Sequence, residues 1–488
     1  PLVNIGAVCY VLGNLSLILG GALVAPLVVA FWYETGDLST SKEIQAFFVT
    51  ALIALLFGAA LRSIFRTSQA LVRLREGFAV VSFSWLLFTL LGMQPYLLSG
   101  ATQSVTDAFF ETMSGFTTTG ATIFANVELL PPGLQFWRCM TQWLGGMGIV
   151  VLSVALLPLL GVGGYRLLKA ETPGGITYQR DQARITDSAK EMWQLYLLLS
   201  GVLALLLLAG GMTPFDAMCH AFTTMSTGGF SPHNESIAYF EVPYLQWVLI
   251  FFMFVAGTSF SGHALVLRGQ FKRAFGNIEF QTYVVFLIAA TIIGVLVEPL
   301  LGSWEESIRT VAFQIVSVST TTGFATYDFQ QWSPLTHFVL IALMFMGGCM
   351  GSTAGGMKVT RILVYSKSVS RELHRMIFPH GVRPLKLGKR VLEPHVASNI
   401  MAFGSLFVFS FFAGTAVMVF FDYDLITAMT ASVSALANIG PGLGRVGPTE
   451  NWGHLPDTVK WVMSFLMLLG RLELFSVVVL LTPWIWRR

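Results

Sequence analysis

Long apolar stretches alternate with short amphipathic ones along most of this chain. A helix needs about 20 apolar residues to cross the hydrocarbon core of a bilayer. Ten stretches approach or exceed that length: 5–31, 45–61, 78–98, 133–160, 191–211, 243–267, 281–301, 334–364, 399–421 and 457–486. The stretch at 45–61 is the shortest, and glycines interrupt 334–364. The pattern predicts an all-α protein that crosses a membrane many times.

Four amphipathic segments between the later stretches are too short to cross. They lie near 107–117, 214–225, 305–319 and 424–436, and they fit helices that enter the membrane and turn back. Non-helical backbone at membrane depth is tolerated only inside protein or beside a water-filled cavity. We therefore expect these four segments to line a wet interior.

A Gly-centred tetrapeptide follows each short segment. The copies are Thr117-Thr118-Thr119-Gly120, Met225-Ser226-Thr227-Gly228, Thr320-Thr321-Thr322-Gly323 and Ala437-Asn438-Ile439-Gly440. Four copies in register define an internal repeat, which decides the architecture before any other argument. The predicted units are 71–165, 166–270, 271–375 and 376–488, after a two-helix segment at 1–70.

A second landmark repeats in the long stretch after each tetrapeptide, where a proline is followed by glycine fourteen residues later. The pairs are Pro132 and Gly146, Pro243 and Gly257, Pro334 and Gly348, and Pro456 and Gly470. At about 1.5 Å of rise per helical residue, these glycines should lie roughly 21 Å inward from the prolines. We expect them at one depth, directly beneath the tetrapeptides.

Composition and charge agree with a membrane location. Hydrophobic residues make up 54% of the chain and charged residues 11%, whereas globular proteins have roughly 25% charged residues. Of the 29 Lys and Arg residues, 23 fall in loops on one predicted side, and cytoplasmic loops carry such an excess. Both termini are therefore predicted in the cytoplasm and the tetrapeptides near the outer face. The net charge of +3 gives no sign of a nucleic-acid partner.

The chemistry of four such units favours a cation. The C-terminal end of a helix is the negative end of its dipole, and rings of backbone carbonyls replace the hydration shell of potassium in selective filters. Glycine permits backbone angles that other residues resist. Asp107, Asp216, Asp424 and the pair Glu305 and Glu306 lie near the starts of the short segments. They complement the positive dipole ends, or they are ordinary helix caps.

Taken together, several motifs resemble the Trk/Ktr/HKT superfamily of cation transporters, most closely the membrane subunit of the bacterial Trk potassium-uptake type. The residues that carry the resemblance are 107–111, 114–122, 143–148, 347–356, 438–442 and 470–473. The resemblance implies an all-α polytopic fold of four pseudo-symmetric helix–pore loop–helix repeats around one pore, preceded by two extra N-terminal helices. It implies potassium uptake across a bacterial inner membrane, in a homodimer controlled by a cytosolic ring of subunits that bind ATP, ADP or NAD. This chain itself shows no nucleotide site and is expected to hold no cofactor.

The same resemblance assigns the filter. The expected potassium-binding residues are Thr118, Thr119, Gly120, Ser226, Thr227, Gly228, Thr321, Thr322, Gly323, Asn438, Ile439 and Gly440. In this superfamily a serine at the first filter glycine accompanies sodium permeability, so four glycines favour potassium. Ile439 lacks the hydroxyl that its counterparts carry, which makes a ring of four hydroxyls impossible.

Two features beneath the filter are gate candidates. One is the small-residue break that contains Gly347, Gly348, Cys349, Gly351, Ser352, Thr353, Gly355 and Gly356. Each glycine destabilises a continuous helix by about 1 kcal/mol, although small residues also let helices pack closely. The other is Arg471, the only basic residue deep in a predicted stretch. A charge there costs at least about 2.5–3.5 kcal/mol, so it is functional or sits in a structural ion pair.

Other functions leave weaker traces. A proton- or sodium-coupled symporter would normally carry acids or histidines within its spans, and such acids are scarce here. His220 and His263 are expected to be packed rather than to bind a ligand. No H-E-x-x-H or G-x-S-x-G motif indicates an intramembrane enzyme. A less selective potassium and sodium carrier remains an alternative, because selectivity depends on filter geometry.

Overall fold

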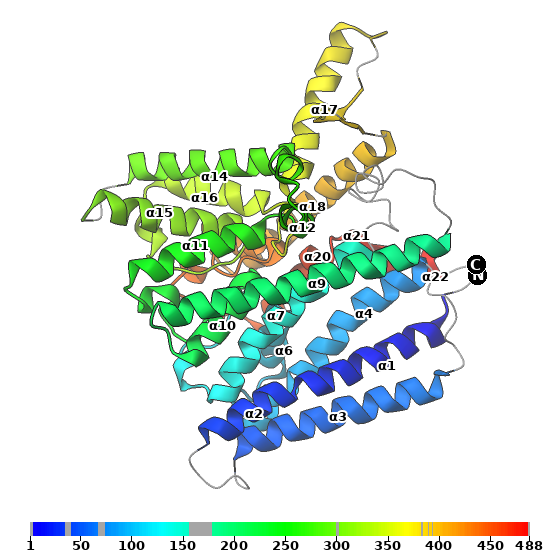
Figure 1. The fold of residues 1–488 in the computed structure, drawn as a ribbon, viewed down its shortest axis with the longest axis vertical. Coiled ribbons are helices and arrows are strands. Elements are labelled where there is room, and N and C mark those ends of the chain that lie inside the picture. The colour runs from blue at the N-terminus through cyan, green and yellow to red at the C-terminus, as the bar shows by residue number, and fades with distance from the viewer. Residues whose placement is uncertain are drawn as a thin grey trace.

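The computed structural model describes residues 3–34, 41–66, 74–155, 178–298, 302–381, 384–388, 390–392 and 394–486, and most of them lie in α-helices. Figure 1 shows the longer helices running roughly side by side, with α17 projecting away from the others. The first and last described helices, α1 (Ile5–Ala22) and α22 (Pro483–Trp486), approach the same side of the molecule. The predicted all-α fold is confirmed.

The N-terminal segment forms a helical hairpin. Helix α1 continues almost directly into α2 (Val24–Tyr33), and α3 (Lys42–Ile64) runs back along α1. A Cβ atom on Gly58 would lie 2.7 Å from the carbonyl oxygen of Gly13, so the two backbones nearly touch. The Ser16 hydroxyl also donates to the carbonyl of Ala54 at 2.7 Å. Small residues that permit close approach are typical of helix pairs in membranes.

After this hairpin, one order of elements occurs four times: an outer helix, a short helix, a 3-10 turn and an inner helix. The first unit has α4 (Leu74–Gly92) with α5 (Gln94–Ser99), α6 (Val105–Phe116), η2 (Val127–Leu129) and α7 (Pro132–Ala155). The second has α9 (Tyr178–Ala209), α10 (Pro214–Met225), η3 (Ser236–Tyr239), α11 (Pro243–Gly257), α12 (Phe260–Leu267) and α13 (Phe271–Phe275).

The third unit has α14 (Ile278–Val297), α15 (Trp304–Ser319), η4 (Phe329–Gln331), α16 (Pro334–Met346) and α17 (Val359–Ile377). A two-stranded antiparallel pair, β1 (Lys386–Leu387) with β2 (Arg390–Val391), follows. The fourth has α18 (Pro394–Phe420), α19 (Leu425–Ala437), η5 (Gly444–Val446), α20 (Asp457–Arg471) and α21 (Phe475–Leu481). The unit boundaries stay predictions, because the repeats were set from sequence spacing.

All four short helices were predicted within a few residues of where they lie. Each begins at a side chain that accepts a hydrogen bond from the backbone N–H three residues later, which satisfies a donor left free by the helix start. The capping residues are Ser104, Thr213, Ser303 and Asp424. Of the acids at these starts, only Asp424 is itself the cap. Asp107 instead pairs with Lys460 at 2.6 Å, and Asp216 with His233 at 3.1 Å.

The long spans are less regular than the sequence suggests. Among the described residues, six helices are long and apolar enough to cross a membrane, or eight if two bent pairs each count as one span. The spans predicted at 243–267 and 457–486 are each bent in the middle: α11 and α12 meet at 103°, and α20 and α21 at 117°. Thr258 and Ser259 are extended, and Glu473 and Leu474 have positive φ, so neither helix continues. Residues 156–160 and 299–301 of the predicted spans lie outside the described residues.

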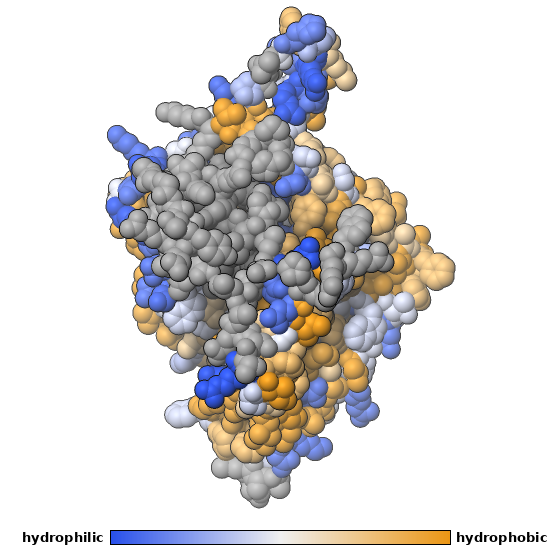
Figure 2. Space-filling view, turned by 90° about the vertical axis from the view of Figure 1, so that its right-hand side faces the viewer, coloured by the Kyte–Doolittle hydropathy of each residue, from blue (hydrophilic) through white to orange (hydrophobic). Residues whose placement is uncertain are grey.

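Figure 2 views the molecule from the side that the chain ends approach. Hydrophilic side chains gather on the projecting segment at the top, while hydrophobic side chains cover much of the described flanks. Exposed apolar residues occur throughout the outer helices, for example Phe48 at 60%, Val285 at 63% and Phe409 at 71%. A large apolar surface of this kind is what lipid-facing helices present.

Candidate ion pore

The four Gly-centred segments touch one another in a closed ring. A Cβ atom on Gly120 would lie 2.1 Å from the carbonyl oxygen of Gly228. The same test places Gly229 at 1.9 Å from the Thr322 oxygen, Gly323 at 2.0 Å from the Ile439 oxygen, and Gly440 at 2.8 Å from the Thr119 oxygen. Each segment therefore contacts the next, and the fourth contacts the first. No side chain fits at these glycines.

Backbone angles correct the alignment of the second segment. Thr118, Thr227, Thr321 and Asn438 all have φ between 52° and 59°. Two residues after each comes a glycine with positive φ, namely Gly120, Gly229, Gly323 and Gly440. Gly229 is thus the counterpart of the other filter glycines, and Gly228 takes the place of Thr119, Thr322 and Ile439. Two adjacent glycines left the choice open in the sequence, and only φ decides it.

A second set of contacts repeats this register. The N–H groups of Thr119, Gly228, Thr322 and Ile439 donate to carbonyls of their own short helices at 2.8, 2.8, 2.9 and 2.9 Å. Each segment is therefore tied back to the C-terminal, negative end of its helix. Positive φ at a β-branched residue is a strained conformation, and strain of this kind persists only where the surroundings enforce it. Three of the four positions with this positive φ are threonines, so the packing around the ring must hold them in a conformation that they would not otherwise adopt.

A cavity of about 140 Å³ opens on one side of the ring. Its lining includes all four register glycines, together with loop residues such as Asn234 and Glu450. A water molecule occupies roughly 30 Å³ in the liquid, so the cavity has room for a few waters or a partly hydrated ion. The ring thus has a polar vestibule formed by all four units.

The third inner helix is broken on the other side of the ring, as the sequence predicts. Helix α16 ends at Gly347, which has φ of 68°, and α17 begins only at Val359. We call residues 347–358 the 347–358 loop. The loop contains all eight residues of the small-residue break that were predicted to form a gate. Cys349, Thr353 and Ala354 of this loop are buried.

The 347–358 loop contacts the ends of three short helices. The Thr353 hydroxyl lies within hydrogen-bond distance of the carbonyls of Met225 (3.1 Å) and Ala256 (3.2 Å). The N–H of Gly355 donates to the Thr321 hydroxyl at 2.7 Å, and the N–H of Gly356 to the carbonyl of Ala437 at 3.1 Å. The loop therefore lies directly against the ring and joins the second, third and fourth units.

Arg471 occupies the place that glycine holds in the other inner helices. Helices α7, α11 and α16 begin at Pro132, Pro243 and Pro334, but α20 begins at Asp457 rather than at the proline before it. Fourteen residues after the first helical residue come Gly146, Gly257, Gly348 and Arg471. The predicted match of Gly470 is therefore one residue early. Gly470 corresponds instead to Gly145, because each of the two glycines lies against a backbone carbonyl at the end of the short helix of its own unit.

The Arg471 side chain bridges the layer beneath the ring. Its guanidinium donates to the carbonyl of Thr353 at 2.7 Å and to that of Gly145 at 3.3 Å. Residue Arg471 is 3% exposed, and no carboxylate pairs with it in the described part of the chain. Glu473, two residues on, pairs instead with Arg361 of α17. The structural ion pair considered for Arg471 is thus not formed among the described residues.

Both histidines singled out in the sequence form hydrogen bonds within the protein. His220 is fully buried and bonds to the carbonyl of Asp216 and to the Ser231 hydroxyl. His263 contacts the carbonyl of Val255 and the Thr258 hydroxyl. Within the described ranges no group of three His, Cys, Asp or Glu residues could hold a metal ion. The ring segments themselves present backbone carbonyls and threonine hydroxyls, and the ion-binding and gating roles stay predictions.

Comparison with known proteins identifies the family. The family model TrkH, described as a cation transport protein, matches residues 43–485. The chain is 36% identical over 486 residues to the Trk system potassium uptake protein TrkH of Salmonella typhimurium, covering 99% of each protein. It is 38% identical over 482 residues to TrkH of Halomonas elongata, covering 98% of each.

A solved structure agrees with these relatives. The crystal structure of the potassium transporter TrkH from Vibrio parahaemolyticus superposes with a TM-score of 0.90 and 34% sequence identity, covering 99% of this chain and 100% of that one. The likeness therefore extends over nearly the whole chain. The chain belongs to the TrkH family of cation transport proteins.

Proposed function

We propose that this chain is the pore-forming subunit of a potassium-uptake system and that potassium ions pass through the ring of Gly-centred segments. The closed contact between the fourth segment and the first carries the proposal, since only a closed ring can surround an ion. The names of the relatives, which are potassium uptake proteins, give the ion. Carbonyl oxygens in the ring replace the hydration shell that a potassium ion loses on entering.

The filter in this proposal follows the backbone register. It comprises Thr118, Thr119, Gly120, Ser226, Thr227, Gly228, Gly229, Thr321, Thr322, Gly323, Asn438, Ile439 and Gly440. Gly229 joins the set predicted from the sequence, and Gly228 contributes its carbonyl at the position of Thr119. Ile439 differs from its counterparts only in its side chain, which leaves the carbonyl in place.

The gate in this proposal is the 347–358 loop together with Arg471. The loop lies beneath the ring on the path of an ion leaving the filter, and Arg471 adds a positive charge at the same depth. A buried charge of the same sign as the ion raises the barrier to passage. Conduction therefore requires the loop and the guanidinium to move aside.

Regulation would reach the gate through α17. This helix begins directly after the 347–358 loop and projects from the rest of the protein, carrying basic residues such as Lys367, Arg371 and Arg375. We place it on the cytoplasmic side, with both termini, in an inner-membrane homodimer. A cytosolic ring of subunits that bind ATP, ADP or NAD would bind to α17 and, through this helix, displace the 347–358 loop.

The test is ion flux through purified protein in liposomes, with reversal potentials measured under potassium, sodium and proton gradients. The proposal expects potassium or rubidium flux and a reversal potential that follows the potassium gradient. A potential that shifts with the proton gradient would instead establish symport. If no cation flux appears either with or without the regulatory ring, the pore function is overturned.

A further inference from the structure

One position on the four short helices carries a different residue in each unit. It lies six residues before Thr117, Ser226, Thr320 and Ala437, and it holds Glu111, His220, Gln314 and Ala431 respectively. All of these side chains except Ala431 are polar, and Glu111 and His220 are 1% and 0% exposed. They sit behind the ring, where they face the chain that leaves each filter glycine.

In each unit, a side chain at or next to this position binds the segment that follows the filter glycine. Glu111 accepts from the N–H of Ile123 at 2.9 Å and from the Thr122 hydroxyl at 3.1 Å. His220 bonds to the Ser231 hydroxyl, and Gln314 contacts Thr326. In the fourth unit the neighbouring Thr430 accepts from the N–H of Leu443 at 2.9 Å. This contact between the short helix and the segment after the filter glycine occurs in all four units, but only the first unit makes it with a charged side chain.

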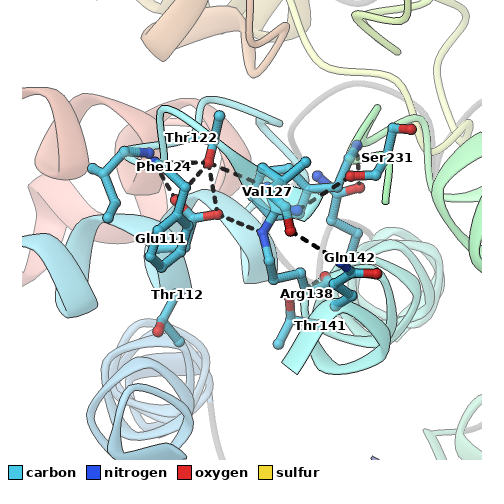
Figure 3. A network of polar contacts seen from close by, with 12 residues as sticks. Glu111, Thr112, Thr122, Phe124, Val127, Arg138, Thr141, Gln142 and Ser231 are labelled. Atoms are coloured by element: carbon cyan, nitrogen blue, oxygen red, sulfur yellow. Dashed lines mark hydrogen bonds and ion pairs between the residues drawn. The ribbon is translucent and has the colours of Figure 1, made fainter. Parts of the chain in front are cut away.

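Arg138 of α7 completes this contact in the first unit and extends it to the second. Figure 3 shows Arg138 among Glu111, Thr122 and Ser231. Its Nε donates to Glu111 at 2.8 Å, one Nη to the Thr122 hydroxyl at 3.2 Å, and the other Nη to the carbonyl of Ser231 at 3.2 Å. The guanidinium also lies 4.2 Å from the ring centre of Phe230. The Arg138 side chain thus binds the segments that follow the filter glycines of both the first and the second unit.

The ion pair is an unusual choice for this place. Its side chains are 1% and 0% exposed, and desolvating both charges is so costly that well-packed apolar residues are often at least as stable. The other inner helices do have apolar residues at the matching position, namely Leu249, Leu340 and Met463, all buried. The fold therefore does not need an arginine there, and its retention at the first–second boundary calls for a role beyond stability.

We infer that Arg138 and Glu111 are positioning residues that set ion selectivity, by fixing the distance between the first and second filter strands. The inference rests on the proposed pore function. The strands in question include Gly120 and Gly229, where a Cβ atom would lie 2.1 and 1.9 Å from a carbonyl oxygen of the neighbouring segment, so the segments are closely packed. Selectivity in a carbonyl ring depends on the size and rigidity of the cage, so a looser boundary admits sodium.

The test compares Glu111→Gln, Arg138→Lys and wild type in liposomes, with the potassium-to-sodium permeability ratio read from bi-ionic reversal potentials. Glu111→Gln keeps the shape but leaves the arginine charge unpaired, and the ratio should fall by about fivefold or more. Arg138→Lys keeps the charge but lacks the fork that reaches three partners at once, so a smaller fall is expected. A tenfold change corresponds to about 59 mV for a monovalent ion.

Glu305→Gln is the matched control. Glu305 also pairs with an arginine, Arg309 at 3.0 Å, but both lie in the same short helix α15, and the Glu305 side chain is 55% exposed at the start of that helix. Its ratio should equal that of wild type. If Glu111→Gln does not fold, Thr122→Val decides the matter, because it removes only the hydroxyl that both partners share.

The outcomes separate the two proposals. Unchanged permeability ratios in Arg138→Lys and Thr122→Val, with normal potassium flux in wild type, would overturn the positioning role and leave the pore intact. Absence of potassium flux in wild type would overturn the pore function itself. A lower ratio in the variants but not in Glu305→Gln supports the inference, since a purely structural role would change the amount of folded protein and not its selectivity.

Discussion

The ring of Gly-centred segments and the layer directly beneath it are built by the same four units, but they differ in symmetry. In the ring, all four segments share the positive φ, the backbone hydrogen bond to the short helix and the contact with the next carbonyl. In the layer beneath, α7 is one uninterrupted helix as far as Ala155, α11 and α20 end in sharp bends, and α16 gives way to the 347–358 loop.

The difference indicates two kinds of task. In the proposed filter, an ion coordinated by carbonyls from all sides needs equal backbone geometry from each unit, whereas a side chain such as that of Ile439 is free to vary. The layer beneath has a residue that breaks the pattern, Arg471, and a loop held by a few hydrogen bonds, including one from Arg471 to Thr353 and one from Met350 to Glu279. A neutral bond contributes about 0.5–1.5 kcal/mol net and a bond to a charged group about 1.5–3 kcal/mol, so we expect the loop to be released more readily than the closed ring.

Each of the two regions also contains an ion pair, and the two pairs join different parts of the molecule. Behind the ring, Arg138 and Glu111 are locked in a buried pair between two units. Beneath it, Arg361 of α17 pairs with Glu473, just after Arg471, and lies 3.8 Å from the ring centre of Phe403. The second pair joins the projecting helix to the bend that follows Arg471, so motion of α17 would be transmitted to the proposed gate.

The largest expected effect comes from breaking the ring. Gly229→Ala should abolish rubidium flux, because the new methyl would meet the Thr322 carbonyl at 1.9 Å at a residue whose φ is 78°. Gly228→Ala should retain measurable flux, since its methyl meets the Gln142 side chain and its φ is not positive. Gly201→Ala, with open space around it, is the control. Equal loss in Gly228→Ala and Gly229→Ala would contradict the corrected register.

Removing the charge beneath the ring should have the next largest effect. Arg471→Ala should raise potassium flux by about tenfold or more, because a like charge a few ångströms from the ion path costs over 1.4 kcal/mol at an effective dielectric constant of about 20. Flux is measured by rubidium uptake per folded protein. The control is Arg268→Ala, whose side chain is 58% exposed and pairs with Glu191. Unchanged or lower flux in folded Arg471→Ala would argue against the gate.

The smallest effect should come from loosening the 347–358 loop. Thr353→Val removes the hydroxyl that contacts the carbonyls of Met225 and Ala256, and flux should rise roughly fivefold for about 1 kcal/mol of lost hydrogen bonding. The same assay applies. Thr291→Val is matched in chemistry, since the Thr291 hydroxyl bonds only within its own helix, to Leu287. A rise of equal size in the two variants would remove the loop from the gate.

Much of this fold follows from the sequence because a membrane narrows the choices. Backbone groups in lipid must be satisfied internally, so apolar length predicts helices, and short apolar helices predict segments that turn back. Asp424, which the sequence offers as a helix cap, is one, whereas the caps Ser104, Thr213 and Ser303 lie just before the acids that the sequence offers. The recurrence of glycine after each short helix predicts the ring, and the run from Gly347 to Gly356 predicts the break. These features depend on neighbours within about 15 residues along the chain.

Only the tertiary structure decided the register and the partners. Whether Gly228 or Gly229 takes the filter position depends on φ, which the adjoining segments enforce, and the alignment of Arg471 with Gly146 depends on where α20 begins. The bond from Arg138 to Ser231 joins residues 93 positions apart in two units, and the pair of Arg361 with Glu473 joins residues 112 positions apart. A sequence specifies which residues are apolar or charged, but pairing depends on how the helices pack, because contacts between units are set by the shapes of both surfaces.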